Sequence, residues 1–111
     1  MRQIAVFAGI AFLTVGASVA YAAGNAESGK SKAAQVCAAC HGPDGNKPSA
    51  PDQPVLAGQY PDYLVKALSD YKSGKRQNPI MKGFASTLSK QDMEDLAAWF
   101  SSQKSALHDQ R

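Results

Sequence analysis

Cysteine and histidine are scarce in this sequence, which has only two of each among 111 residues. A structural zinc site needs four ligands, and beside Cys37, Cys40 and His41 the only other histidine is His108, close to the last residue of the sequence. A disulfide between the two cysteines would close too short a loop to contribute much stability. The scarcity therefore argues against a zinc-centred domain and against a disulfide-stapled one.

Net charge is also small, at +3 from 12 Lys and Arg against 9 Asp and Glu, and the lysines are scattered along the chain. Nucleic-acid binding needs a clustered basic face, so we expect no nucleic-acid partner. The sequence also lacks a convincing strand pattern and an internal repeat. These absences, together with the helical segments described below, predict an all-α fold.

Charged side chains are missing between Arg2 and Glu27. The apolar run Ile4–Val15 is followed by small residues that end at Ala22, which is the order of parts in a secretory signal peptide. We predict that residues 1–22 are cleaved, that the protein works in the periplasm, and that residues 23–111 form one domain without stable membrane insertion. The alternative is an uncleaved anchor, because about 20 apolar residues can span a bilayer.

Three segments carry helical signals. Glu27–Gln35 is rich in Lys and Ala, Pro61–Ser73 begins with a proline suited to a first turn, and Lys90–Gln103 follows a serine that can cap it. Between the first two, Gly42–Gly58 is rich in Gly, Pro and Asp and is predicted as a loop. So long a loop in a small domain is uncommon unless it wraps something, such as a cofactor.

The segment Cys37-Ala38-Ala39-Cys40-His41 has the spacing of a c-type haem attachment site. Each thiol can add across one haem vinyl group, and the adjacent His41 imidazole is then presented to the iron from one face. The alternative is a bare redox pair of the thioredoxin kind, but such a pair normally precedes a helix in a strand–helix–strand setting. Here a Gly-Pro-Asp-Gly turn follows instead.

A second axial ligand has to come from elsewhere, and a thioether sulfur suits an electron carrier because it raises the reduction potential. Met1 leaves with the signal peptide, and Met93 lies on the apolar stripe of the last helix, where methionine usually fills a core. This favours Met81, which we predict to lie in a loop because Asn78-Pro79 disfavours helix just before it. If Met81 is instead an ordinary apolar contact, the function shifts toward ligand binding.

Four further segments accompany the Cys37–Gly42 motif: Pro54-Val55-Leu56-Ala57-Gly58-Gln59, Asn78-Pro79-Ile80-Met81, Leu88-Ser89-Lys90-Gln91-Asp92 and Asp95-Leu96-Ala97-Ala98-Trp99-Phe100. With them the sequence resembles class I cytochromes c, most closely the small bacterial cytochromes c5 and c553 and a single domain of cytochrome c4. The resemblance implies a small single-domain cytochrome c fold, with helices and loops wrapped around one haem.

The same resemblance implies roles for individual residues. Cys37 and Cys40 would bind the haem covalently, and His41 and Met81 would be the axial iron ligands. The backbone carbonyl of Pro54 would accept a hydrogen bond from the other ring nitrogen of the histidine. The family fold also crosses the first and last helices, and it places a small residue, Gly29, against the ring of Trp99.

We therefore predict an electron carrier rather than an enzyme, a monomer that exchanges single electrons with donor and acceptor proteins. Two other functions stay open. A haem sensor or peroxidase-like protein would have a displaceable sixth ligand and would bind carbon monoxide readily. A thiol-disulfide oxidoreductase would be colourless, with two titratable thiols after reduction.

Overall fold

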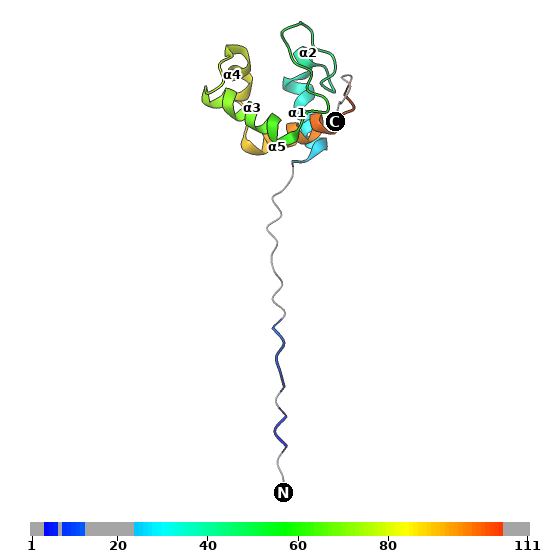
Figure 1. Ribbon diagram of the computed structural model, residues 1–111, viewed down its shortest axis with the longest axis vertical. Helices are drawn as coiled ribbons and strands as arrows, with labels where there is room; N and C mark the ends of the chain where they lie inside the picture. Colours follow the sequence, from blue (N-terminus) through cyan, green and yellow to red (C-terminus); the bar gives the residue numbers. More distant parts are fainter. Residues whose placement is uncertain (1–3, 7, 13–23, 106–111) are drawn as a thin grey trace.

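The computed structural model describes residues 4–6, 8–12 and 24–105. The described residues form five α-helices and no strand, so the predicted all-α fold is confirmed (Figure 1). The helices are α1 (Ala26–Val36), α2 (Ala38–His41), α3 (Pro61–Ser73), α4 (Pro79–Ala85) and α5 (Lys90–Ser101). Within the described ranges, no helix combines the length and the apolar character needed to cross a membrane. The predicted cleavage site at Ala22 and the second histidine, His108, lie outside the described residues.

The three predicted helices are confirmed to within a residue or two at their ends, and local chemistry explains where each begins. The Asn25 side chain accepts the Ser28 backbone N–H at 2.9 Å, which caps α1. Pro61 occupies the first turn of α3, and Gly74 ends that helix with φ +82°, a conformation that side chains disfavour. Ser89 and Asp92 cap α5 reciprocally, each side chain accepting the other residue's backbone N–H.

Helices α1 and α5 cross in close contact at Gly29. A Cβ atom on Gly29 would stand 1.9 Å from the Asp95 carbonyl oxygen and 2.9 Å from the Trp99 Cβ atom, so a larger residue cannot fit without moving the helices. Gly29 therefore lies beside the Cβ atom of Trp99, and the backbone of Asp95 comes closer still, while contact with the Trp99 ring stays a prediction. The Trp99 indole N–H also donates to the Pro43 carbonyl at 3.0 Å, which ties α5 to the loop after α2.

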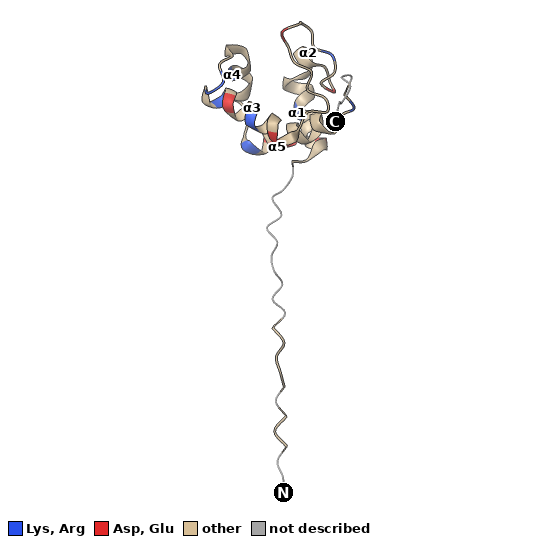
Figure 2. Ribbon diagram, in the orientation of Figure 1, with Lys and Arg blue, Asp and Glu red and all other residues tan. Residues whose placement is uncertain are grey.

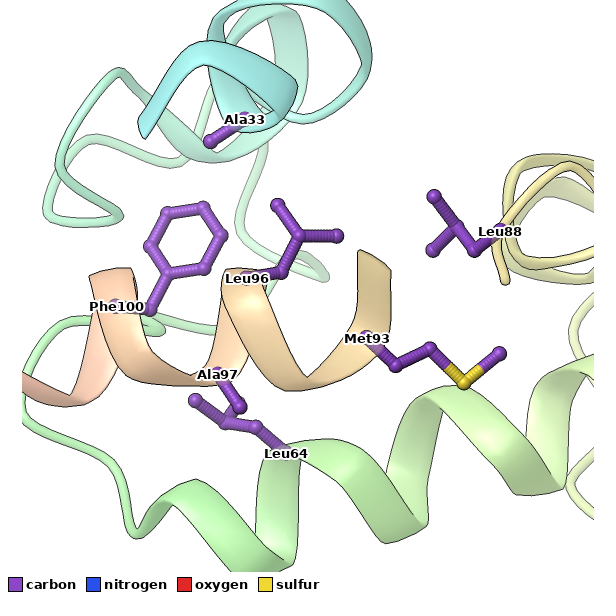
Figure 3. Packing of buried hydrophobic residues seen from close by; sticks show 7 residues of the cluster. All are labelled: Ala33, Leu64, Leu88, Met93, Leu96, Ala97 and Phe100. Atoms are coloured by element: carbon purple, nitrogen blue, oxygen red, sulfur yellow. The ribbon is translucent and has the colours of Figure 1, made fainter. Parts of the chain in front are cut away.

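The buried core lies between α1, α3 and α5. Figure 3 shows Leu96 and Phe100 of α5 pointing toward Ala33 of α1, while Ala97 faces Leu64 of α3. Met93 is 4% exposed and belongs to this cluster, and its sulfur accepts a hydrogen bond from the Ser69 hydroxyl at 3.5 Å. Its predicted role as core filling is confirmed.

The predicted loop after the cysteine motif is also confirmed, since no helix or strand occurs between α2 and α3. The loop is held in place by backbone hydrogen bonds, among them Lys47 N–H to the His41 carbonyl at 3.2 Å and Leu56 N–H to the Gly45 carbonyl at 2.9 Å. Gly45 has φ +80°, and a Cβ there would lie 2.8 Å from the Phe100 ring. The loop can therefore lie flat against the end of α5.

The prediction that Met81 lies in a loop is wrong, because Met81 belongs to α4. Proline does keep Asn78 extended, at φ −156° and ψ 111°, but Pro79 itself begins a helix. The Asn78 side chain accepts the backbone N–H groups of Ile80 and Met81, both at 3.1 Å, and so caps the first turn. Helix α4 then packs against α3.

Candidate functional site

One large cavity, of about 550 Å³, opens among the helices. All five helices contribute to its wall, for example through Val36 of α1, His41 of α2, Leu64 of α3, Met81 of α4 and Leu96 of α5. In Figure 1, α2 and α4 lie on opposite sides of the helical domain, with α3 and α5 between and below them. The volume falls within the ~300–1,000 Å³ typical of small-molecule and cofactor sites.

His41 forms one wall of the cavity. The residue is only 7% exposed, and its Nδ1 atom lies 2.9 Å from the Pro54 carbonyl oxygen. A carbonyl oxygen can only accept, so Nδ1 carries the proton and the lone pair is on Nε2. This tautomer leaves Nε2 able to bind a metal, and the expected contact with Pro54 is present.

Short helices and backbone hydrogen bonds fix the position of this imidazole. The Ser49 N–H donates to the Cys40 carbonyl at 2.9 Å, next to the Lys47–His41 bond described above. On the other side, the Gln53 side chain accepts the backbone N–H groups of Ser49 and Ala50. The loop that carries Pro54 is thereby folded back onto α2.

Both cysteines line the same cavity and neither forms a disulfide. Cys37 lies at the junction where α1 ends and α2 begins, and Cys40 is within α2. Burial raises the pKa of the Cys37 thiol to about 11. A thiol-disulfide oxidoreductase needs a cysteine with a lowered pKa, so the surroundings of Cys37 are unsuited to that chemistry.

Met81 lines the cavity from α4 and is half-buried. The other described methionine, Met93, is absent from the wall of this cavity. The structure therefore brings Met81 into one cavity with Cys37, Cys40 and His41, although these residues are separated by about 40 positions in the sequence. Whether its sulfur binds a metal remains a prediction.

The rest of the wall is mostly apolar. It includes the α3 residues Tyr63, Leu64, Leu68 and Tyr71. The wall also includes Arg76, an exposed residue of the segment between α3 and α4. Arg76 lies between the end of α3 at Gly74 and the Asn78-Pro79 pair that begins α4.

The donor set fits a haem better than a bare metal ion. In the described part of the chain, no group of three or more His, Cys, Asp or Glu side chains is placed to hold a metal. A haem iron receives four nitrogen ligands from its own ring, so it needs only two from the protein. An imidazole and a thioether in one apolar cavity, with two unpaired thiols beside the imidazole, match that requirement.

These features define an all-helical domain with a mostly apolar cavity, whose lining residues suit a planar redox cofactor. The chain belongs to the cytochrome c family: residues 26–104 match the family model described as Cytochrome c. Membership in this family and the Cys37–Cys40 pair are consistent with covalent haem c.

Relatives of known sequence support the assignment. The chain is 54% identical over 93 residues to cytochrome c4 of Pseudomonas aeruginosa, covering 83% of this chain and 45% of that protein. It is 40% identical over 85 residues to cytochrome c-554(548) of Halomonas halodenitrificans, covering 74% of this chain and all of that protein. Homology to these cytochromes implies electron transfer.

Among solved structures, reduced recombinant cytochrome c4 from Pseudomonas stutzeri superimposes with a TM-score of 0.70 at 49% identity. The match covers 77% of this chain and 48% of that one. The chain thus spans about half the length of the cytochromes c4 that it matches.

Proposed function

We propose that this protein is a mono-haem c-type cytochrome that transfers single electrons between redox partner proteins. Cys37 and Cys40 attach the haem through thioether bonds, and His41 and Met81 are the axial ligands. When bound, the haem supplies a one-electron couple between ferrous and ferric iron. The observation that carries this proposal is the 2.9 Å contact between His41 Nδ1 and the Pro54 carbonyl, which directs the lone pair of Nε2 into a cavity also lined by both cysteines.

The residues of this chain have separate tasks in such a carrier. The Pro54 carbonyl keeps His41 in one tautomer and orientation in both oxidation states. The Met81 sulfur raises the reduction potential and keeps other ligands away from the iron. Leucine side chains on α3, on α5 and in the segment between α4 and α5 exclude water from the cavity, which limits rearrangement when the charge of the iron changes. No substrate bond is made or broken.

We further propose that the chain is exported, cleaved after Ala22 and works as a monomer in the periplasm. The described residues Ile4, Val6, Ile10 and Phe12 are each at least 78% exposed and take no part in the core. In Figure 1 their segments lie away from the helices, as expected for a leader that the folded domain does not need. Its donor and acceptor would dock briefly through small interfaces.

Covalent attachment is tested on periplasmic material from a host with a haem-ligation system. After denaturation and an acid-acetone wash, the porphyrin spectrum should stay with the polypeptide. The variant C37A/C40A should lose it to the solvent wash. A colourless native protein with two titratable thiols would overturn the proposal in favour of a thiol-disulfide oxidoreductase.

Carbon monoxide separates the carrier from a sensor or peroxidase-like protein. The native ferrous protein should keep its spectrum under carbon monoxide, because the Met81 sulfur already fills the sixth position. Ready binding by the native protein would instead show an open or displaceable site.

A further inference from the structure

The Pro54 carbonyl that meets His41 belongs to a loop that has few backbone donors. Residues 48–54 include Pro48, Pro51 and Pro54, and proline has no backbone N–H. Charged residues are also sparse along the loop after α2 (Figure 2), and the ion pairs found among the described residues all lie on helices. The position of the Pro54 carbonyl therefore depends on contacts made by uncharged side chains.

Gln53, the residue before Pro54, supplies these contacts. Its side-chain oxygen accepts the Ser49 N–H and the Ser49 hydroxyl, both at 2.9 Å, and the Ala50 N–H at 3.0 Å. The Gln53 backbone N–H donates back to the Ala50 carbonyl at 3.1 Å. Because backbone N–H groups can only donate, the side-chain atom that faces them is the amide oxygen. Water competes for any single hydrogen bond on an exposed loop, but three donors that converge on one atom hold it in one place.

These hydrogen bonds close a ring around His41. The Ser49 N–H also donates to the Cys40 carbonyl at 2.9 Å, so Ser49 joins Gln53 to Cys40. Peptide bonds join Cys40 to His41 and Gln53 to Pro54, and the 2.9 Å contact between His41 and Pro54 completes the ring. Movement of the Pro54 carbonyl away from His41 therefore requires that some of these hydrogen bonds break.

We propose that Gln53 is a positioning residue for His41: its side-chain oxygen holds the Pro54 carbonyl against the imidazole and thereby lowers the reduction potential of the bound iron. This inference rests on the proposed function. A hydrogen bond from Nδ1–H to a carbonyl makes the imidazole a more basic ligand. Ferric iron has one more positive charge than ferrous iron, so a more basic ligand stabilises the ferric form. Loss of the Gln53 contacts should therefore favour the ferrous form.

The test compares Q53L with the native protein, both loaded with haem. Leucine still covers this part of the cavity wall but accepts no hydrogen bond. The chain after Pro54 stays anchored, because the Leu56 N–H donates to the Gly45 carbonyl at 2.9 Å. We expect the ferrous-to-ferric ratio of Q53L at a fixed applied potential to rise about threefold, equivalent to about 28 mV at 59 mV per decade for a one-electron couple.

Two further variants separate positioning from a change of polarity in the cavity wall. Ser49 is exposed and does not line the cavity, so S49A removes one hydrogen bond to Gln53 and leaves the wall unchanged. We expect the ratio to rise in S49A, by less than in Q53L. Q103A is the matched control, because the Gln103 amide donates to the Trp99 carbonyl and the Ser102 hydroxyl and does not line the cavity. Its ratio should equal that of the native protein.

A second measurement reads the hydrogen bond between His41 and Pro54 itself. In NMR spectra of the ferrous protein, the His41 Nδ1–H should exchange with solvent deuterium on the order of tenfold faster in Q53L, because a loosened Pro54 carbonyl protects it less. Q53E should restore the native exchange rate, since a carboxylate oxygen can accept the same three hydrogens. Q53E is compared by exchange alone, because its added charge shifts the reduction potential by itself.

The outcomes separate this inference from the proposed function. A potential in Q53L equal to or below that of the native protein, an unchanged exchange rate, or no recovery in Q53E would each overturn the role of Gln53 while leaving a haem carrier in place. A shift in Q103A as large as that in Q53L would do the same. Should Q53L fail to assemble, both measurements are made on S49A, and native values there overturn the role. A native protein without covalent haem would overturn this inference and the proposed function together.

Discussion

Asp95 and Asn25 join the two ends of the folded domain across 70 positions of sequence. The Asn25 backbone N–H donates to Asp95 Oδ1 at 2.7 Å, at the point where α1 begins. The same oxygen accepts the Gln91 side-chain amide at 2.8 Å, and Asp95 is 8% exposed. This carboxylate thus fixes the start of α1 against the middle of α5.

We predict that D95A lowers the free energy of unfolding by about 1–3 kcal/mol, because it leaves a partly buried backbone N–H without its acceptor. Chemical denaturation of the haem-loaded protein measures the change. Q91A is the control, since it leaves the Asn25 bond intact and should cost less than D95A. Equal losses of unfolding free energy in D95A and Q91A would show that the hydrogen bond between Asp95 and Asn25 adds no stability of its own.

Two glycine-to-alanine substitutions should have opposite effects. At Gly29 a Cβ would stand 1.9 Å from the Asp95 carbonyl oxygen, so G29A must push α1 and α5 apart and should cost at least about 3 kcal/mol or prevent folding. Gly83 lies inside α4, and a Cβ there meets no other atom within 4 Å. G83A should therefore stabilise the protein by up to about 1 kcal/mol through helix propensity. Thermal unfolding of both variants tests this. A G29A protein as stable as G83A would contradict the close contact between α1 and α5 at Gly29.

Replacing Met81 should change the iron without changing the fold. We expect M81A to keep its covalent haem, to bind carbon monoxide in the ferrous state, and to have a reduction potential lower by on the order of 0.1 V, since axial ligands set haem potentials over about 0.8 V. M93L is the control, because Met93 lies in the core and a volume-conserving exchange there should cost less than about 1.5 kcal/mol. A native-like potential and no carbon monoxide binding in M81A would exclude Met81 as the ligand.

The cap of α5 should contribute to acid sensitivity. The Ser89 backbone N–H donates to the Asp92 carboxylate, and this bond lowers the pKa of the Asp92 carboxyl from its usual value of 3.8. The Ser89 hydroxyl and the nearby Lys32 lower this pKa further. A carboxyl whose pKa is lower in the folded than in the unfolded protein stabilises the fold at pH values above its unfolded pKa. This stabilisation is lost as the pH falls through the folded pKa. We expect D92N to lose less stability than the native protein between pH 5 and pH 3 in urea titrations. Parallel pH profiles would contradict the prediction.

Local signals in the sequence located three of the helices with good accuracy. Pro61, Gly74 and the Ser89–Asp92 box are start and stop signals that act within a few residues, so no knowledge of the rest of the fold was needed. Helix α4 was missed because it has only seven residues. An isolated helix of that length is unstable in water, and α4 is supported by packing against α3.

The sequence by itself predicted a haem-attachment motif at Cys37, Cys40 and His41, because thiols and an imidazole at that spacing can reach one haem whatever the distant parts of the chain do. Only the tertiary structure decided that Met81 of α4 and the α3 residues Leu64 and Leu68 share their cavity. Those placements depend on how α3, α4 and α5 pack, and packing is set by contacts such as Asp95 with Asn25 that join residues far apart in the chain. Spacing along a sequence carries no information about which distant side chains meet across a cavity.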